Sequence, residues 1–127
     1  MPLETINPAP MRRMYDQFHF SQGVRVGDLV VCSGQIGASD GKVPADAKEE
    51  FRNAWRAVGM VLETAGLSYA NVVEYTTFHV GLQQHLADFM KVRDEFLREP
   101  WPAWTAIGIT ELALPGARLE IRVTARA

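Results

Sequence analysis

The sequence predicts an α+β domain in which two helices lie against one face of a mixed β-sheet. Three observations lead to this prediction. Residues 47–65 repeat apolar side chains at steps of three and four, the spacing of an amphipathic helix. Residues 119–125 alternate apolar with polar side chains, as a strand with one covered face does. Strand-like and helix-like segments follow one another in the order ββαβαββ, which is typical of an α+β layer.

The first elements are weakly patterned. Pro2, Pro8 and Pro10 predict that residues 1–14 form an extended N-terminal arm. A first strand is expected within residues 15–26, and a turn after Val26 leads into a second. That second strand, Leu29 to Cys32, is apolar at every position, which is typical of a strand covered on both faces.

The later elements are better marked. Gly66 lies where a helix C-cap would end the helix of residues 47–65. Pro100 and Pro102 are expected to end a second helix. The remaining elements are, in order, a strand at 72–80, that second helix at 85–98, and strands at 106–109 and 119–125.

The predicted helices can cover only one face of the sheet, because both crossovers are expected to have the same hand. The strand from Leu29 to Cys32 nevertheless needs cover on its other face. We therefore expect a second copy of the chain to meet that face in a symmetric oligomer.

Size and charge limit the function. The 127 residues, 47% hydrophobic and 22% charged, fit one domain spanning 1–127 with a core of its own. The net charge is −2, so the surface has no general attraction for nucleic acid or anionic membranes. The start of the chain lacks secretory-signal features, and no apolar stretch approaches the ~20 residues of a membrane span. A cytoplasmic location is expected.

Several chemistries lack their motifs. The only cysteine, Cys32, lies in an apolar run and is expected to be a buried, inert thiol. The three histidines form no metal-ligand pattern, so neither a metal nor a cofactor is expected. His79 is interpreted as a hydrogen-bonded sheet residue and His85 as solvated. Charged runs at 49–50 and 93–95 are interpreted as solvated helix faces. Phosphate-binding glycine loops and a hydrolase nucleophile elbow are both missing.

An ordered set of segments along nearly the whole chain resembles the Rid family, also called YjgF or L-PSP, whose best-known branch is the RidA enamine/imine deaminases. The matching segments are Phe20-Ser21-Gln22-Gly23, Val30-Val31-Cys32-Ser33-Gly34-Gln35-Ile36, Leu62-Glu63-Thr64-Ala65-Gly66-Leu67, Val72-Val73-Glu74-Tyr75-Thr76-Thr77-Phe78, Asp88-Phe89, Pro102-Ala103 and Leu114-Pro115-Gly116-Ala117-Arg118-Leu119-Glu120-Ile121. Each segment is a weak signal alone; their order makes the set specific.

The resemblance implies a chorismate-mutase-like fold and a homotrimer with small-molecule pockets between neighbouring subunits. In RidA-like members an arginine after Pro-Ala clamps the substrate carboxylate. A glutamate in the last strand positions the water that hydrolyses an imine to a keto acid and ammonia. Carried onto this chain, the catalytic glutamate is Glu120. The substrate-binding positions are Phe20, Ser33, Gly34, Trp104, Thr105 and Ala106.

The chain departs from the family pattern at the arginine, which is replaced by Trp104. Indole offers one N–H and no charge, whereas guanidinium offers a charged fork of donors. Losing a two-pronged clamp would forfeit about 3–5 kcal/mol, or roughly a hundredfold to a thousandfold or more in imino-acid affinity. Phe20 also lacks the phenolic hydroxyl of the family's tyrosine. Arg93 falls where the family often has asparagine; it could replace the lost cation, although a solvated helix arginine is the favoured interpretation.

We therefore expect a Rid-family protein that binds a small molecule at an intersubunit cleft and is not a standard 2-imino-acid deaminase. Trp104 and Phe20 would favour aromatic or apolar ligands. In the competing interpretation Trp104 plugs the cleft. A second hypothesis retains hydrolysis, with Glu120 guiding water onto a different, less acidic imine or enamine. Endoribonuclease activity, a name attached to the family, is the weakest alternative because the chain has no basic stripe.

Overall fold

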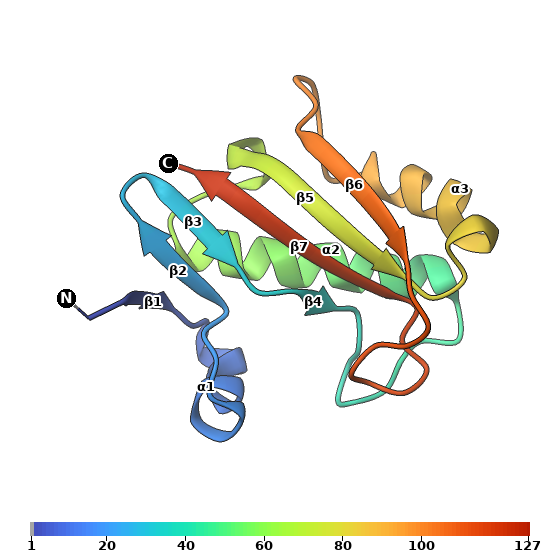
Figure 1. Ribbon diagram of the computed structural model, residues 1–127, viewed down its shortest axis with the longest axis horizontal. Coiled ribbons are helices and arrows are strands. Elements are labelled where there is room, and N and C mark those ends of the chain that lie inside the picture. Colours follow the sequence, from blue (N-terminus) through green and yellow to red (C-terminus); the bar gives the residue numbers. More distant parts are fainter. Residues whose placement is uncertain (1) are drawn as a thin grey trace.

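The computed structural model describes residues 2–127. It is a mixed sheet with helices α2 (Ala47–Thr64) and α3 (Leu82–Arg93) on one face (Figure 1). The strands are β1 (Glu4–Ile6), β2 (Gly23–Val26), β3 (Leu29–Cys32), β4 (Gln35–Ile36), β5 (Val72–His79), β6 (Ala103–Gly108) and β7 (Leu119–Arg126). Their order is β1-β2-β3-β7-β5-β6, and β4 also pairs with β7. Only the pair β5–β6 is parallel. The predicted fold class is confirmed.

Alternation along β5 and β7 defines the two faces of the sheet. Leu119, Ile121 and Val123 point into the core beneath the helices and are almost completely buried. Glu120, between the first two, therefore points to the opposite face. That opposite face has no covering element within residues 2–127 (Figure 1). It exposes apolar side chains: Val26, Leu29, Val31 and Ile107 are 59%, 38%, 37% and 40% exposed.

The helix α2 forms where its apolar stripe predicts. Asp46 caps its start by accepting a hydrogen bond from the backbone N–H of Lys48 at 3.1 Å. Its buried apolar side chains pack on β7 and α3, and they are Phe51, Ala54, Trp55, Val58, Val61 and Leu62. Gly66, at φ 78°, takes the left-handed conformation that follows the helix.

The N-terminal segment differs from the prediction of an extended arm over residues 1–14. Residue 1 lies outside the described part; β1 pairs with β2, a 3-10 turn spans Ala9–Met11, and helix α1 (Arg12–Phe18) follows. The strand expected within residues 15–26 is accordingly confined to β2. Every α1 side chain is exposed, so this helix has no apolar stripe that periodicity could detect.

Two later boundaries also differ. The second helix begins at Leu82 rather than 85 and ends at Arg93 rather than 98, because the chain turns at Asp94 well before the prolines. Strand β6 begins at Ala103 rather than 106. Trp104, Thr105 and Ala106 therefore lie within a strand, where neighbouring side chains point to opposite faces.

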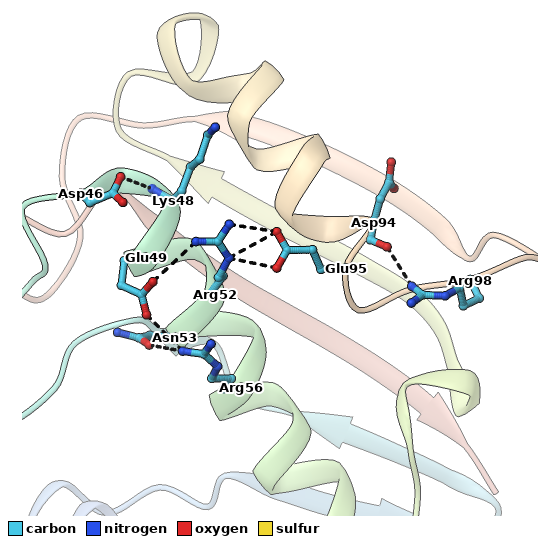
Figure 2. Close-up of polar contacts among 9 residues, drawn as sticks. All are labelled: Asp46, Lys48, Glu49, Arg52, Asn53, Arg56, Asp94, Glu95 and Arg98. Atoms are coloured by element: carbon cyan, nitrogen blue, oxygen red, sulfur yellow. Dashed lines mark hydrogen bonds and ion pairs between the residues drawn. The ribbon is translucent and has the colours of Figure 1, made fainter.

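The turn after α3 is tied to α2 on the outer surface (Figure 2). Arg52 donates to both carboxylate oxygens of Glu95, with bonds of 2.9–3.3 Å, and Glu49 lies on its other side. Arg98 donates to the backbone carbonyl of Asp94 at 2.8 Å. These contacts fix the segment that immediately follows Arg93.

Glu50 departs from the expectation of a solvated charged run. Its side chain is fully buried, and its Oε2 accepts a 2.7 Å hydrogen bond from the backbone N–H of Arg118. The Arg118 Nε lies 2.9 Å from Oε1. Burial raises the pKa of Glu50, while its contacts with Arg118 oppose that rise. This pair joins α2 to the start of β7 and thereby positions the strand that carries Glu120.

Candidate functional site

Six of the seven predicted site residues separate into two groups within one chain. Phe20, Ser33, Gly34 and Glu120 form the Glu120 group, near β2, β3 and the β4 end of β7. Trp104 and Ala106 belong to the Trp104 group on β6, the far edge strand of the sheet (Figure 1). The sequence motifs gave no sign of this separation.

Glu120 is a half-buried carboxylate on the face without helices. Its strand neighbours across the sheet are Phe78 on β5 and Ile36 on β4. Burial raises its pKa, and within residues 2–127 no hydrogen bond or ion pair engages its carboxylate. A methyl group at Gly34 would lie 2.6 Å from the Glu120 Cδ, so glycine makes room for this side chain. An unpaired carboxylate of raised pKa is a better proton acceptor than an ordinary one.

Ser33 has a structural partner for its hydroxyl. Its Oγ donates to the backbone carbonyl of Ser21 at 2.7 Å, which joins the segment after β3 to the segment before β2. The buried side chains of Gln22 and Gln35 strengthen this joint through a 2.6 Å hydrogen bond. Both glutamines belong to the family-like segments, but their sequence pattern did not indicate this role. Ser33 therefore shapes the Glu120 group and is not arranged as a nucleophile, because its hydroxyl is held by a carbonyl and not by a base.

Phe20 and Ser33 line an open depression of about 730 Å³ beside β1 and α1. Tyr15 and His19 also line it, and neither was predicted as a site residue. Both come from α1 or its end, a helix that the sequence did not reveal. The depression is open to solvent and has both polar and aromatic walls.

Trp104 lies on the helix-covered face, opposite to Glu120. Its ring stacks on Tyr75 with centroids 5.8 Å apart and planes 9° apart, and it also contacts Phe89 of α3 at 5.7 Å. Its Nε1–H donates to the Thr77 hydroxyl at 2.9 Å. The only polar atom of the indole is thus already engaged, so Trp104 has no donor left for a ligand carboxylate.

The three predicted β6 residues divide by face. Ala106 pairs with buried Thr77, so it is on the same face of the sheet as Trp104. Thr105 pairs with Thr76 and is on the face of Glu120. Within one chain Trp104 and Phe20 are not neighbours, because β2 and β6 are far apart in the strand order. That both residues line one cleft between subunits therefore stays a prediction.

The Thr77 hydroxyl also contacts His79, whose Nε2 lies 2.7 Å away. His79 is fully buried, and its Nδ1 has no partner within the described chain. Burial, and secondarily the electrostatic effect of the neighbouring His85, lowers the pKa of His79 to about 4. The expectation of a hydrogen-bonded sheet histidine is confirmed. His85 itself is half-buried and meets the Phe51 ring edge-on, so it is not the solvated side chain expected.

Arg93 is also not the solvated helix arginine that the sequence favoured. Its side chain is 18% exposed, and its guanidinium carbon lies 5.1 Å from the centroid of the Trp104 ring. Trp101 is on another side, at 6.0 Å. Arginine commonly packs over indole in this way, attracted by the negative face of the ring. We therefore include Arg93 and Trp101 in the Trp104 group.

Other chemistries have little support in the described residues. Cys32 is buried, and burial raises the pKa of its thiol to about 11, which confirms the prediction of an inert cysteine. Across residues 2–127, acidic, cysteine and histidine side chains nowhere gather in the threes that a metal ion needs. None of the helices described has the length and apolarity to cross a bilayer.

Fold and site together define a class of protein: a mixed sheet with helices on one face and a half-buried, unpaired carboxylate on the other face. Residues 11–127 match the model of the family described as Endoribonuclease L-PSP. The chain belongs to this family, which is the Rid or YjgF family that its motifs resemble.

Known relatives agree with this assignment. The RutC family protein YjgH of Escherichia coli is 36% identical over 121 residues, covering 94% of this chain and 91% of the relative. A protein of Bos taurus named 2-iminobutanoate/2-iminopropanoate deaminase is 34% identical over 113 residues, covering 84% and 78%. A solved structure of YjgH has a TM-score of 0.88 at 33% identity, covering 99% of this chain and 97% of that one. The structure of E. coli TdcF with bound serine has a TM-score of 0.78 at 28% identity, covering 85% and 87%.

Proposed function

We propose that this chain binds a small molecule in a site assembled between copies of itself in a homotrimer. The observation that carries the proposal is the placement of the Glu120 and Trp104 side chains on opposite faces of one sheet, on strands β7 and β6 that β5 separates. A single ligand cannot contact both groups within one chain. A neighbouring copy that covers the exposed face can bring its Trp104 group to the Glu120 group of the first.

The exposed face supports assembly. It carries apolar side chains at β2, β3 and β6 that a monomer would leave in water, among them Val26 at 59% exposure. Polar side chains occupy its middle, including Glu120 and Arg122. Such a mixed surface suits the interface of a symmetric oligomer that also encloses a polar site.

The proposed ligand differs from the small 2-imino acids of the named deaminases. Where deaminases of the family have an arginine, this chain has Trp104, whose N–H is bonded to Thr77. A short imino acid bound at that position would find no charged donor on the strand. Standard 2-imino-acid deamination is therefore not the activity that we propose.

A second candidate function is hydrolysis of a different imine or enamine. The unpaired Glu120 carboxylate, with its raised pKa, favours it. Glu120 would accept a proton from water as the water attacks the C=N carbon. The proton held by Glu120 and the remaining proton of the attacking water both pass to the nitrogen, which leaves as ammonia while the carbon keeps the water oxygen as a carbonyl. General-base assistance of this kind contributes typically ~10²–10⁴-fold.

Sedimentation and ammonia release test the two parts of the proposal. We expect a trimer in solution, and a monomer would contradict the assembled site. With freshly generated 2-iminobutanoate we expect release far slower than that of the bovine relative, and faster release by Trp104→Arg. Turnover at the relative's rate would refute the altered specificity. Release no faster than in buffer with every imine tried would remove the hydrolase candidate and leave binding.

A further inference from the structure

Arg93 holds a positive charge at the edge of the sheet next to Trp104. It is on the last turn of α3, while Trp104 is on β6, and the two side chains meet at 5.1 Å. The indole ring is itself fixed by Tyr75 and Thr77. The guanidinium of Arg93 therefore packs against an indole ring that is itself held in place.

The contacts of Arg93 leave part of the guanidinium without an acceptor. Its Nε–H donates to the Asp94 carboxylate at 3.0 Å. A guanidinium has five N–H donors. Within residues 2–127, Asp94 is the only carboxylate that forms an ion pair with Arg93, and it is an adjacent, half-exposed residue.

The surrounding structure keeps this cation in place. The following turn is held by the bidentate Arg52–Glu95 pair and by Arg98, as Figure 2 shows. Trp101 is on another side of the guanidinium and is 55% exposed, so it presents a free aromatic surface next to the charge. A charged fork beside an exposed indole is suited to a ligand that has an anionic end and a flat apolar body.

We propose that Arg93 is the anion-binding residue of this site and that its ligands are small carboxylates with an aromatic or apolar body. The inference rests on the proposed small-molecule site and names its substrate class. The carboxylate binds the Arg93 fork, and the body of the ligand lies against Trp101. In this chain the positive charge comes from helix α3, while Trp104 on the strand supports it.

Phenylacetate and its neutral analogue phenylacetamide test the proposal with the assembled protein. Binding is followed by tryptophan fluorescence and confirmed by calorimetry, in wild type, Arg93→Gln and Arg93→Lys. The matched control is Arg56→Gln, because Arg56 is an exposed arginine on α2 paired with Glu49. Near-ultraviolet circular dichroism checks that each variant is folded, and Arg93→Lys retains the charge if Arg93→Gln does not fold.

We expect wild type to bind phenylacetate more tightly than phenylacetamide, by about tenfold or more. Arg93→Gln should weaken phenylacetate binding by a similar factor and leave phenylacetamide unchanged. Arg93→Lys should give an intermediate loss, and Arg56→Gln none. Equal affinity for acid and amide in wild type, or equal effects of the Arg93 and Arg56 variants, overturns the role of Arg93 and leaves the pocket standing. If neither compound binds the assembled protein, the proposed pocket fails as well.

Discussion

Replacing His79 by glutamine should remove a defined part of the acid sensitivity of the fold. His79 is fully buried and its pKa is lowered to about 4 from an ordinary 6.5. The unfolded chain therefore takes up a proton at this residue before the folded chain does. The stability that the neutral, buried His79 contributes is fully present above about pH 6.5. It is lost as the pH falls towards about 4. At 1.36 kcal/mol per pH unit, the loss is about 3 kcal/mol over that window.

The assay is urea unfolding at fixed protein concentration, from about pH 8 to about pH 4. The free energy of unfolding of wild type should fall more steeply with acid than that of His79→Gln, and the difference should level off near the lower end. His19→Asn is the control, because His19 is exposed and asparagine tolerates its left-handed backbone. Parallel curves for wild type and His79→Gln would refute the assignment of a neutral, buried histidine.

Three further substitutions test the contacts that position the site. Glu50→Ala should lower the free energy of unfolding in urea by about 3 kcal/mol, because it removes one partner of a buried ion pair. Glu49→Ala, at an exposed position, should change that free energy by less than about 0.5 kcal/mol. Gly34→Ala should displace the Glu120 side chain and reduce the rate of any imine hydrolysis, measured as ammonia release, by about tenfold or more. An unchanged rate would show that the Glu120 side chain has room to move. Thr77→Val should lower the free energy of unfolding by about 2 kcal/mol, because it leaves the Trp104 N–H and the His79 Nε2 without their partner. Thr77→Ser keeps the hydroxyl and should lower the thermal unfolding temperature less than Thr77→Val does.

Periodicity identified the elements that bury one side. The stripe of α2 and the alternation of β7 each follow from apolar residues that must face the core, and the alternation alone places Glu120 opposite to Leu119 and Ile121. Helix α1 escaped prediction because none of its side chains is buried. The end of α3 escaped because it depends on a turn at Asp94 that no glycine or proline marks.

Motifs named part of the candidate site but not its geometry. Motifs pointed to Glu120 and Trp104, yet their placement on opposite faces depends on the pairing of β6 with β5, which is a long-range contact. The role of Arg93 was hidden for a similar reason. An arginine on a helix usually reaches into water, and only the fold brings Trp104 beneath it.

The central claim is that the Glu120 and Trp104 groups meet only between chains. Cysteines at both Ser33 and Ala106, in a Cys32→Ala background, test it with a short bis-maleimide cross-linker. We expect the double variant to give covalent dimers and trimers on a denaturing gel, while each single variant gives only traces. Monomers linked within one chain, or no cross-link at all, would contradict the account.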